Sequence, residues 1–292
     1  MHEPNQWFLI NPIKLNSMKT TYHLIIFTLV FSAACLNAQN GVQKSLGVSW
    51  GLSNIQRQDL IFSPMIHRDW SPVNTVIDYH RTGKAEQHLM AKFAYYRASI
   101  VEPYEYLSFY NGNETTVPQQ FTVLDLNYDL GFPLVKNDRL QLLMGGRSAN
   151  RLLPSGYSFG NLQSFGYYFS FGLDLWSRLQ FHLGNRNRLS ATLALPLLAY
   201  NARSSYLWHT DPYLMWNYSH NGLKAFGNYL THGELQSWGK ARGIDLDLQY
   251  LHTVNDRWDL GLRYLYSYRY NSDPNRFGQL ENGIYFSGLY KF

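Results

Sequence analysis

The sequence lacks the residues that build disulfides, thiolate metal sites and membrane-spanning helices. Its 292 residues include one cysteine, Cys35, which excludes an intrachain disulfide and a cysteine-based zinc site. One stretch is continuously apolar in character, the eleven residues from Leu24 to Ala34. A membrane-spanning helix needs roughly 20 such residues. The sequence therefore disfavours a helical membrane protein.

Charge is also scarce, and it is not concentrated in any segment. Charged residues make up 15% of the chain, against about 25% in a typical soluble domain. The net charge is +5, but Lys and Arg are scattered, so nucleic acid is not expected as a partner. Aromatic residues are abundant, at 16% with 23 Tyr and 8 Trp. This composition argues against disorder and against an ordinary cytosolic enzyme.

The flanks of the apolar run indicate a secretory signal. Lys19 and His23 precede the run, and the small residues Ser32, Ala33 and Ala34 follow its centre. This is the order of a signal peptide, in which a basic segment, an apolar segment and a cleavage site follow one another. We therefore predict that residues 1–38 form a signal peptide region. A buried N-terminal helix is the alternative.

The boundaries of this signal region leave two alternatives open. Residues 1–17 are unusual ahead of a signal, so Met18 is an alternative start. Cleavage is expected to leave a mature N-terminus between Cys35 and Asn40. Cys35 itself follows small residues, which keeps a lipidated cysteine as a second reading, although Ser32 departs from the lipoprotein pattern.

The remaining chain alternates between apolar and polar residues with a period of two. Leu124, Leu126 and Leu130, for example, alternate with the polar Asp125 and Asp129. Such alternation is typical of β-strands with one apolar face. Ten runs share the pattern: 46–52, 73–79, 89–95, 124–130, 140–144, 165–175, 189–197, 244–250, 258–268 and 284–292. We predict an all-β fold, an antiparallel transmembrane β-barrel of about ten strands (8–12), formed by residues 39–292 as a single domain.

The connections between these runs alternate in length. Short connections rich in turn residues lie at 81–85, 132–138, 183–187 and 253–256. Longer connections lie at 55–72, 99–118, 148–163, 201–243 and 271–281. Short turns on one side and long loops on the other are typical of transmembrane β-barrels. This pattern predicts that both chain ends face the periplasm and that the 201–243 loop is extracellular.

Three features of the sequence favour a transmembrane barrel over a soluble β-sandwich. The apolar runs approach ten residues, the length with which a tilted strand crosses a bilayer. Tyr and Trp gather at run ends, as in membrane-interface girdles. With its final Tyr290-Lys291-Phe292, the chain resembles the bacterial outer-membrane β-barrel proteins. The resemblance implies a bacterial outer-membrane location, a lipid bilayer as surroundings, and an aromatic-x-Phe signal, Tyr290 and Phe292, read by the outer-membrane insertion machinery.

Charges of both signs occupy the face expected to point into the barrel. We predict a lumen charge network of Lys92, Asp125, Asp129, Arg139, Asp245, Asp247, Arg263 and Arg269, with Arg147 and Asp174 nearby. Because an unpaired buried carboxylate is costly, each acid is expected to pair with a base on a neighbouring strand. Asp129 is expected to pair with Arg139, and Asp245 or Asp247 with Arg263 or Arg269. A selectivity ring or a catalytic pair is the alternative to this plugged lumen.

Two short patterns raise a catalytic alternative. Asp78 and His80 are two residues apart and, with Asp245 and Asp247 as a second pair, resemble the residues of the omptin proteases. Their expected place beside a periplasmic turn argues against this reading, because omptin sites open at the outer mouth. Tyr218-Ser219-His220-Asn221-Gly222 resembles the outer-membrane phospholipase A motif, but its Ser and His are adjacent and reversed.

The long 201–243 segment is the main candidate for recognition. Its aromatic and histidine side chains are Trp208, His209, Tyr213, Trp216, Tyr218, His220 and Trp238. Such rings provide rigid contact area for a surface protein or glycan ligand, whereas the simpler reading is a loop packed on itself over the barrel mouth. The three histidines of the segment have no close metal-binding spacing, and we expect no cofactor. The expected role is non-enzymatic: surface binding, adhesion, envelope integrity or assembly. The alternatives are a lipid or peptide hydrolase at the outer mouth and a narrow small-solute channel.

Overall fold

The computed structural model describes residues 42–108, 112–159, 162–205, 207, 222–231 and 233–292. Within them, Gln43–Phe292 forms one compact unit. The expected signal region, 1–38, lies outside the described residues. The strands that form the wall of the unit are β1 (Gln43–Asp59), β2 (Ser63–Ser71), β3 (Asn74–Thr82), β4 (Glu86–Ile100), β7 (Gln119–Lys136), β8 (Leu140–Phe159), β9 (Leu162–Leu183), β10 (Asn187–Arg203), β12 (Ala241–Thr253), β13 (Trp258–Asn271) and β14 (Phe277–Lys291).

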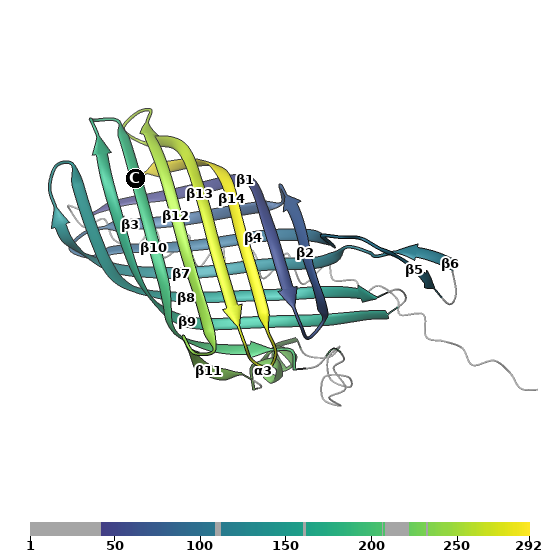
Figure 1. The fold of residues 1–292 in the computed structure, drawn as a ribbon. Coiled ribbons are helices and arrows are strands. Elements are labelled where there is room, and N and C mark those ends of the chain that lie inside the picture. Colours follow the sequence, from purple (N-terminus) through teal and green to yellow (C-terminus); the bar gives the residue numbers. More distant parts are fainter. Residues whose placement is uncertain (1–41, 109–111, 160–161, 206, 208–221, 232) are drawn as a thin grey trace, which may run out of the picture. The chain divides into compact units, whose positions relative to one another are not determined.

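These strands close into an antiparallel barrel of ten wall strands, as predicted (Figure 1). β14 pairs with β1 from Ser45↔Lys291 to Asp59↔Phe277, which closes the ring. β2 and β3 together occupy one wall position, because β3 pairs with the first half of β1 and β2 with the second. The two are separated at Pro72, which has no N–H to donate to a ladder.

The two faces of the wall have opposite chemistry. On β1, Val48, Trp50 and Leu52 point outward, with Trp50 58% exposed, whereas Ser49 and Ser53 point inward and are buried. The hydroxyls of Ser49 and Ser287 hydrogen-bond at 2.7 Å inside the barrel. Apolar side chains therefore cover the outside and polar side chains line the inside. This inside-out, closed ladder is the architecture of a membrane-spanning β-barrel.

The expected insertion residues lie on the outer surface near the barrel closure. The rings of Tyr290 and Trp258 have centroids 5.1 Å apart, and those of Tyr290 and Phe292 are 6.2 Å apart. Phe292 is exposed, and its backbone N–H donates to the carbonyl of Lys44 at 3.0 Å. Adjacent outward rings at one end of a barrel are typical of an interface girdle.

The connections differ from the prediction at one end of the barrel. Residues 83–85, 137–139, 184–186 and 254–257 form short turns, and both ends of the barrel chain lie at this short-turn end. At the opposite, long-loop end, the prediction of long connections at 55–72, 148–163 and 271–281 is wrong. Strands occupy most of these ranges and leave 60–62, 160–161 and 272–276 between them. Outward residues there become polar, as at Gln56 and Gln58, so the apolar pattern stops while the ladder continues.

Two long connections contain elements of their own. β5 (Glu105–Ser108) and β6 (Gly112–Thr115) form a separate hairpin. The 201–243 segment contains a helix, α3 (Gly222–Thr231), and a strand, β11 (Glu234–Ser237), which pairs with β10 at Leu198–Asn201. No described helix is long and apolar enough to span a membrane.

Candidate functional site

The barrel lumen is filled in levels that can be followed along β4. Four of its inward side chains are Glu86, His88, Lys92 and Tyr96, in order from the short-turn end to the long-loop end. All four are buried. Each marks one level: Glu86 and His88 border a cavity, Lys92 belongs to an ion-pair layer, and Tyr96 belongs to an apolar layer.

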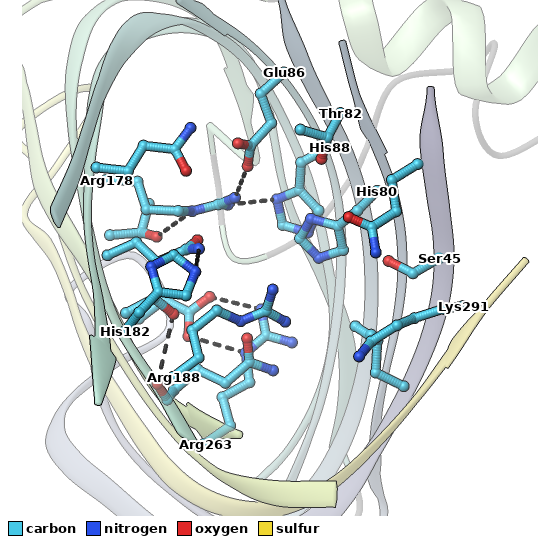
Figure 2. A pocket seen from close by; sticks show the side chains of 18 of the residues that line it. Ser45, His80, Thr82, Glu86, His88, Arg178, His182, Arg188, Arg263 and Lys291 are labelled. Atoms are coloured by element: carbon cyan, nitrogen blue, oxygen red, sulfur yellow. Dashed lines mark hydrogen bonds and ion pairs between the residues drawn. The ribbon is translucent and has the colours of Figure 1, made fainter. Parts of the chain in front are cut away.

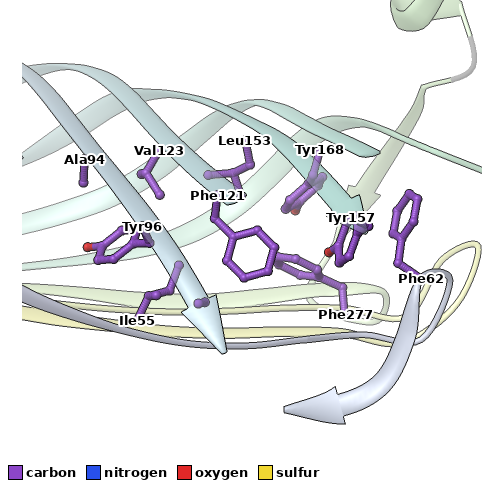
Figure 3. Close-up of a cluster of buried hydrophobic side chains, with 11 residues drawn as sticks. Ile55, Phe62, Ala94, Tyr96, Phe121, Val123, Leu153, Tyr157, Tyr168 and Phe277 are labelled. Atoms are coloured by element: carbon purple, nitrogen blue, oxygen red, sulfur yellow. The ribbon is translucent and has the colours of Figure 1, made fainter. Parts of the chain in front are cut away.

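The level nearest the long-loop end is an apolar cluster that crosses the lumen (Figure 3). Ile55, Tyr96, Phe121 and Phe277 come from different strands and are fully buried. The guanidinium of Arg57 lies over the rings of Phe121 and Phe277, at 4.6 and 5.0 Å from their centroids. Large rings with a cation between them fill the lumen at this level.

The same level is joined to the outer connections by a second arginine. Arg203 donates to a carboxylate oxygen of Asp59 at 2.9 Å and to the carbonyls of Asp273 and Asn275 at 2.9 and 2.6 Å. Both Arg203 and Asp59 are buried. The 272–276 connection is thus attached to the apolar cluster by a hydrogen-bonded arginine.

Below this cluster lies a layer of ion pairs. Arg151 donates to both carboxylate oxygens of Asp125, at 2.5 and 2.7 Å. Lys92 reaches Glu281, three wall positions away on β14, at 2.6 Å, and the hydroxyl of Tyr96 donates to the same Glu281 oxygen at 2.7 Å. These contacts join neighbouring strands and also strands that are not adjacent.

The structure brings most of the predicted lumen charges together. Asp247 pairs with Arg263 at 2.6 Å, and Asp245 pairs with Arg269. The expected pair of Asp129 with Arg139 does not form. Arg139 is exposed in the short turn before β8, whereas Asp129 faces Arg147 across the β7–β8 ladder and accepts its hydrogen bonds.

A histidine with two carboxylate partners lies at the next level. His88 has Asp78 at 2.8 Å from Nε2 and Asp129 at 3.1 Å from Nδ1. Arg263, on the non-adjacent strand β13, donates to Asp78 at 2.6 Å. The ring of His80 stacks on that of His88, with centroids 4.0 Å apart.

This cluster is unsuited to the two chemistries that its residue types suggest. Ligand atoms of Asp78, His80 and His88 lie within 4.8 Å of one another, close enough for a metal ion. However, Arg263 already donates to Asp78, and both nitrogens of His88 face carboxylates. Neighbouring guanidinium charges oppose a cation, and a carboxylate paired with arginine is a weak general base. Asp78 and His80 also lie towards the short-turn end, as expected from the sequence. This position argues against an omptin-like site, which would open at the other end of the barrel.

A polar cavity of about 270 Å³ occupies the short-turn end of the lumen (Figure 2). Every one of the ten wall positions contributes to its lining. Figure 2 shows Arg178, Arg188, Arg263 and Lys291 around the space, with Arg178 joined to Glu86. This cavity is larger than a second polar space in the lumen, of about 30 Å³, which Lys92 and Asp125 line.

The predicted recognition residues fall mostly on a part of the chain outside the described residues. These are Trp208, His209, Tyr213, Trp216, Tyr218 and His220, together with Ser219 of the phospholipase-like pattern. Trp238 is described: its ring is half exposed and its Nε1 donates to the carbonyl of Pro196.

An exposed charge cluster lies beside β11, outside the membrane-spanning strands. Lys240 donates to Asp273 at 2.7 Å and to Glu234 at 3.0 Å. These hydrogen bonds raise the pKa of Lys240, and the bond from Lys240 lowers the pKa of Asp273. The cluster links the 204–240 connection to the 272–276 connection.

Sequence reasoning missed several residues of the lumen: Glu86, His88, Arg151, Arg178 and Glu281. For some of them the sequence held a usable signal, because residues two apart on a strand point to the same face. Glu86 and His88 share the inward parity of Lys92 on β4, and Arg178 shares that of Asp174 on β9. Arg151 and Glu281 fell in ranges that were expected to be loops.

The inside-out barrel with its polar lumen defines the class: the chain has the fold of the bacterial outer-membrane β-barrels. No protein-family model matches the chain. No curated protein matches its sequence.

Solved structures with a similar fold are outer-membrane barrels. The outer membrane protease OmpT from Escherichia coli has a TM-score of 0.47 and 8% identity, over 86% of this chain and 95% of that chain. Neisserial surface protein A has a TM-score of 0.34 and 8% identity, over 86% and 98%. The translocator domain of the autotransporter NalP from Neisseria meningitidis has a TM-score of 0.37 and 8% identity, over 96% of this chain and 100% of that chain. At such low identity the likeness concerns the fold alone.

Proposed function

We propose that this protein is a non-conducting, non-enzymatic barrel of the outer membrane that presents its long-loop end for binding at the cell surface. The filled lumen is the observation that carries the proposal. The apolar cluster around Tyr96, Phe121 and Phe277 crosses the lumen at one level, and the Lys92–Glu281 pair, with the neighbouring-strand pair Arg151–Asp125 beside it, occupies the next. A ten-stranded barrel is only slightly wider than one that side chains fill.

The rings that occupy this lumen are large and buried. Tyr96, Tyr157 and Tyr285 are among the largest fully buried side chains, and Trp176 is 1% exposed. Trp176 donates its Nε1 proton to the carbonyl of Gly146 at 2.9 Å, which fixes the ring against the wall. A solute path would require several such side chains to leave packed positions.

Conductance tests this proposal directly. The full mature chain, reconstituted into planar phosphatidylcholine bilayers, is expected to show no current steps above the leak of the protein-free bilayer. A general porin reconstituted in the same way provides the positive control. Steady single-channel steps from the purified chain would support the channel alternative and overturn the proposal.

We propose that the 201–243 loop is the recognition element for a surface protein or glycan. The described part of the loop supports a defined position: α3 packs on the outer face of the wall, and β11 extends the sheet beside β10. The hydrolase alternative has less support, because Asp78 and His80 lie towards the short-turn end and Asp78 is paired with Arg263.

Orientation is part of the same proposal. The short-turn end is placed in the periplasm, as in other barrels of this architecture, and cleavage within the signal region leaves a mature N-terminus between Cys35 and Asn40. The test uses single cysteines in a Cys35→Ser background. Leu107→Cys on β5 is expected to react with an impermeant maleimide on intact cells, and Lys84→Cys only after the outer membrane is permeabilised. The reverse pattern would invert the topology, and N-terminal sequencing that recovers Met1 or Met18 would exclude the cleavage.

A further inference from the structure

The cavity at the short-turn end has an excess of positive charge on its lining. Its cationic side chains are Lys136, Arg178, Arg188, Arg263 and Lys291. Its carboxylates are Glu86 and Asp247. The histidines His80, His88 and His182 also line it, and they add positive charge when protonated. The lining therefore favours an anion over a cation or a neutral solute.

Two of these cations are already neutralised by the wall. Arg178 pairs with Glu86 and donates to the hydroxyl of Thr192 at 2.9 Å. Arg263 lies between Asp78 and Asp247, at 2.6 Å from each. These arginines are structural: they join non-adjacent strands of the wall and have little capacity for a ligand.

The other three cations are less well matched. Arg188 and Lys291 share a single carboxylate, Asp259, at 3.5 and 2.6 Å. The Arg188 contact is at the limit of a hydrogen bond, and a third of its side chain is exposed. Lys136 is exposed and has no ion-pair partner among the described residues. The single carboxylate of Asp259 therefore faces two cations, and Lys136 adds a third positive charge. This excess leaves capacity for a further anion.

We propose that this cavity binds a small phosphate-bearing anion, inorganic phosphate or a phosphate monoester, with Arg188 as the principal ligand and Lys136 and Lys291 as supporting charges. A guanidinium presents paired N–H donors that match two oxygens of one phosphate group. Neutral donors on the same lining, Gln180 and Ser45, are available for the remaining oxygens. The volume of about 270 Å³ is below the roughly 300–1,000 Å³ of drug-sized pockets, which restricts the ligand to a small molecule or a headgroup.

Access comes from the short-turn end, because the apolar and ion-pair layers fill the lumen on the other side. With the proposed orientation, the ligand enters from the periplasm. The phosphate group can belong to a soluble ester or to the headgroup of an inner-leaflet lipid at the barrel mouth. Only the side of access depends on the proposed function; the cavity chemistry does not.

The test is a calorimetric titration of the full mature chain with inorganic phosphate, in an uncharged detergent at low ionic strength. One saturable site is expected. Arg188→Gln is expected to weaken binding by about tenfold or more, the effect of one charge-assisted hydrogen bond. Lys84→Gln is the matched control, because it removes the same charge from an exposed turn at the same end of the barrel, outside the cavity. It should change the affinity by less than about twofold.

A second variant keeps the test informative if Arg188→Gln does not fold. Lys136 is exposed on the last residue of β7, so Lys136→Gln should fold and should also weaken binding. Absence of saturable binding, or equal losses in the Lys84→Gln and cavity variants, would overturn the proposal.

A competition experiment in lipid nanodiscs then identifies the source of the phosphate group. If phosphatidylglycerol competes with phosphate, and only when Arg188 is present, the ligand is a headgroup; if it has no effect, the ligand is soluble. Neither result changes the expected absence of conductance. The non-conducting barrel and the phosphate site are therefore tested by different measurements, and one can fail without the other.

Discussion

Asp129 faces Arg147 directly across the β7–β8 ladder, and its carboxylate accepts two hydrogen bonds, from Nε at 2.6 Å and from Nη2 at 2.9 Å. Both side chains are buried. Asp129 is also the partner of His88, which in turn contacts Asp78. One directly opposed pair is therefore the link between the ion-pair layer and the edge of the short-turn cavity.

Removal of Arg147 tests this link. Arg147→Gln leaves the Asp129 carboxylate buried without its main partner, and it should lower the free energy of unfolding by about 3–5 kcal/mol. Arg139→Gln is the matched control: Arg139 is exposed in the turn, so it should change stability by less than about 0.5 kcal/mol. Urea unfolding in lipid vesicles measures both. A double-mutant cycle should show coupling of Asp129 with Arg147 and none with Arg139; the opposite result would contradict the β7–β8 register.

The hydroxyl of Tyr96 is expected to contribute to stability through the lumen. It bonds the Ser53 hydroxyl and the Glu281 carboxylate, each at 2.7 Å, in a fully buried position. Tyr96→Phe leaves these groups with fewer partners and should cost about 1–3 kcal/mol. Tyr95→Phe, which removes the same hydroxyl from the outward face, should cost less than about 0.5 kcal/mol. Equal effects of the two variants in urea unfolding would rule out the inward placement of Tyr96.

The outer face of the barrel should reject charge only at membrane depth. Leu248 points outward from β12, so Leu248→Arg should destabilise the protein by about 2–4 kcal/mol if its level is near the bilayer midplane. Gln120→Arg is the control, because Gln120 is exposed on β7 beyond the last apolar outward residues and its variant should cost about 0–1 kcal/mol. Folding into phosphatidylcholine vesicles measures the difference. Comparable costs would place the hydrophobic band elsewhere.

The sequence is most informative where lipid imposes the pattern. Trp50 and Leu52 alternate with buried serines, and this alternation predicts both the strand and its outward face. Beyond Leu52 the outward positions are polar, so nothing in the alternation distinguishes a strand from a loop. The alternation therefore predicts connections at 55–72 and 148–163, where the structure has the end of β1, all of β2 and the second half of β8.

Partners inside the lumen are predictable only in part. Asp247 and Arg263 lie on adjacent strands, and counting residues from their turn predicts that they are close. The pairs Lys92–Glu281 and Arg263–Asp78 join strands three wall positions apart, so they depend on barrel curvature, which a strand pattern does not contain. The basic cavity is of this second kind, since all ten wall positions contribute to it.

The last prediction concerns the attachment of the 201–243 loop to the barrel wall. Tyr229 of α3 packs against Tyr167 of β9, with ring centroids 4.4 Å apart, and Phe226 packs against Phe169 at 5.3 Å. Tyr167 and Phe169 alternate with the inward Tyr168, so they lie on the outer face of the wall. The helix therefore covers outward rings at the long-loop end rather than the barrel mouth. Removal of its rings should detach the helix and leave the barrel intact.

Phe226→Ala removes one of these rings while keeping a strong helix former in the helix. We expect hydrogen exchange of the α3 amides to become at least about tenfold faster, because a loss of roughly 1.4 kcal/mol or more of packing increases local opening by that factor. The amides of β13 and β14 should keep their protection. Gly227→Ala, at an exposed position of the same helix with open space around it, is the control and should not accelerate exchange of α3. If Phe226→Ala instead accelerates exchange throughout the barrel, α3 is part of the folding core and the 201–243 loop is not a separable recognition element.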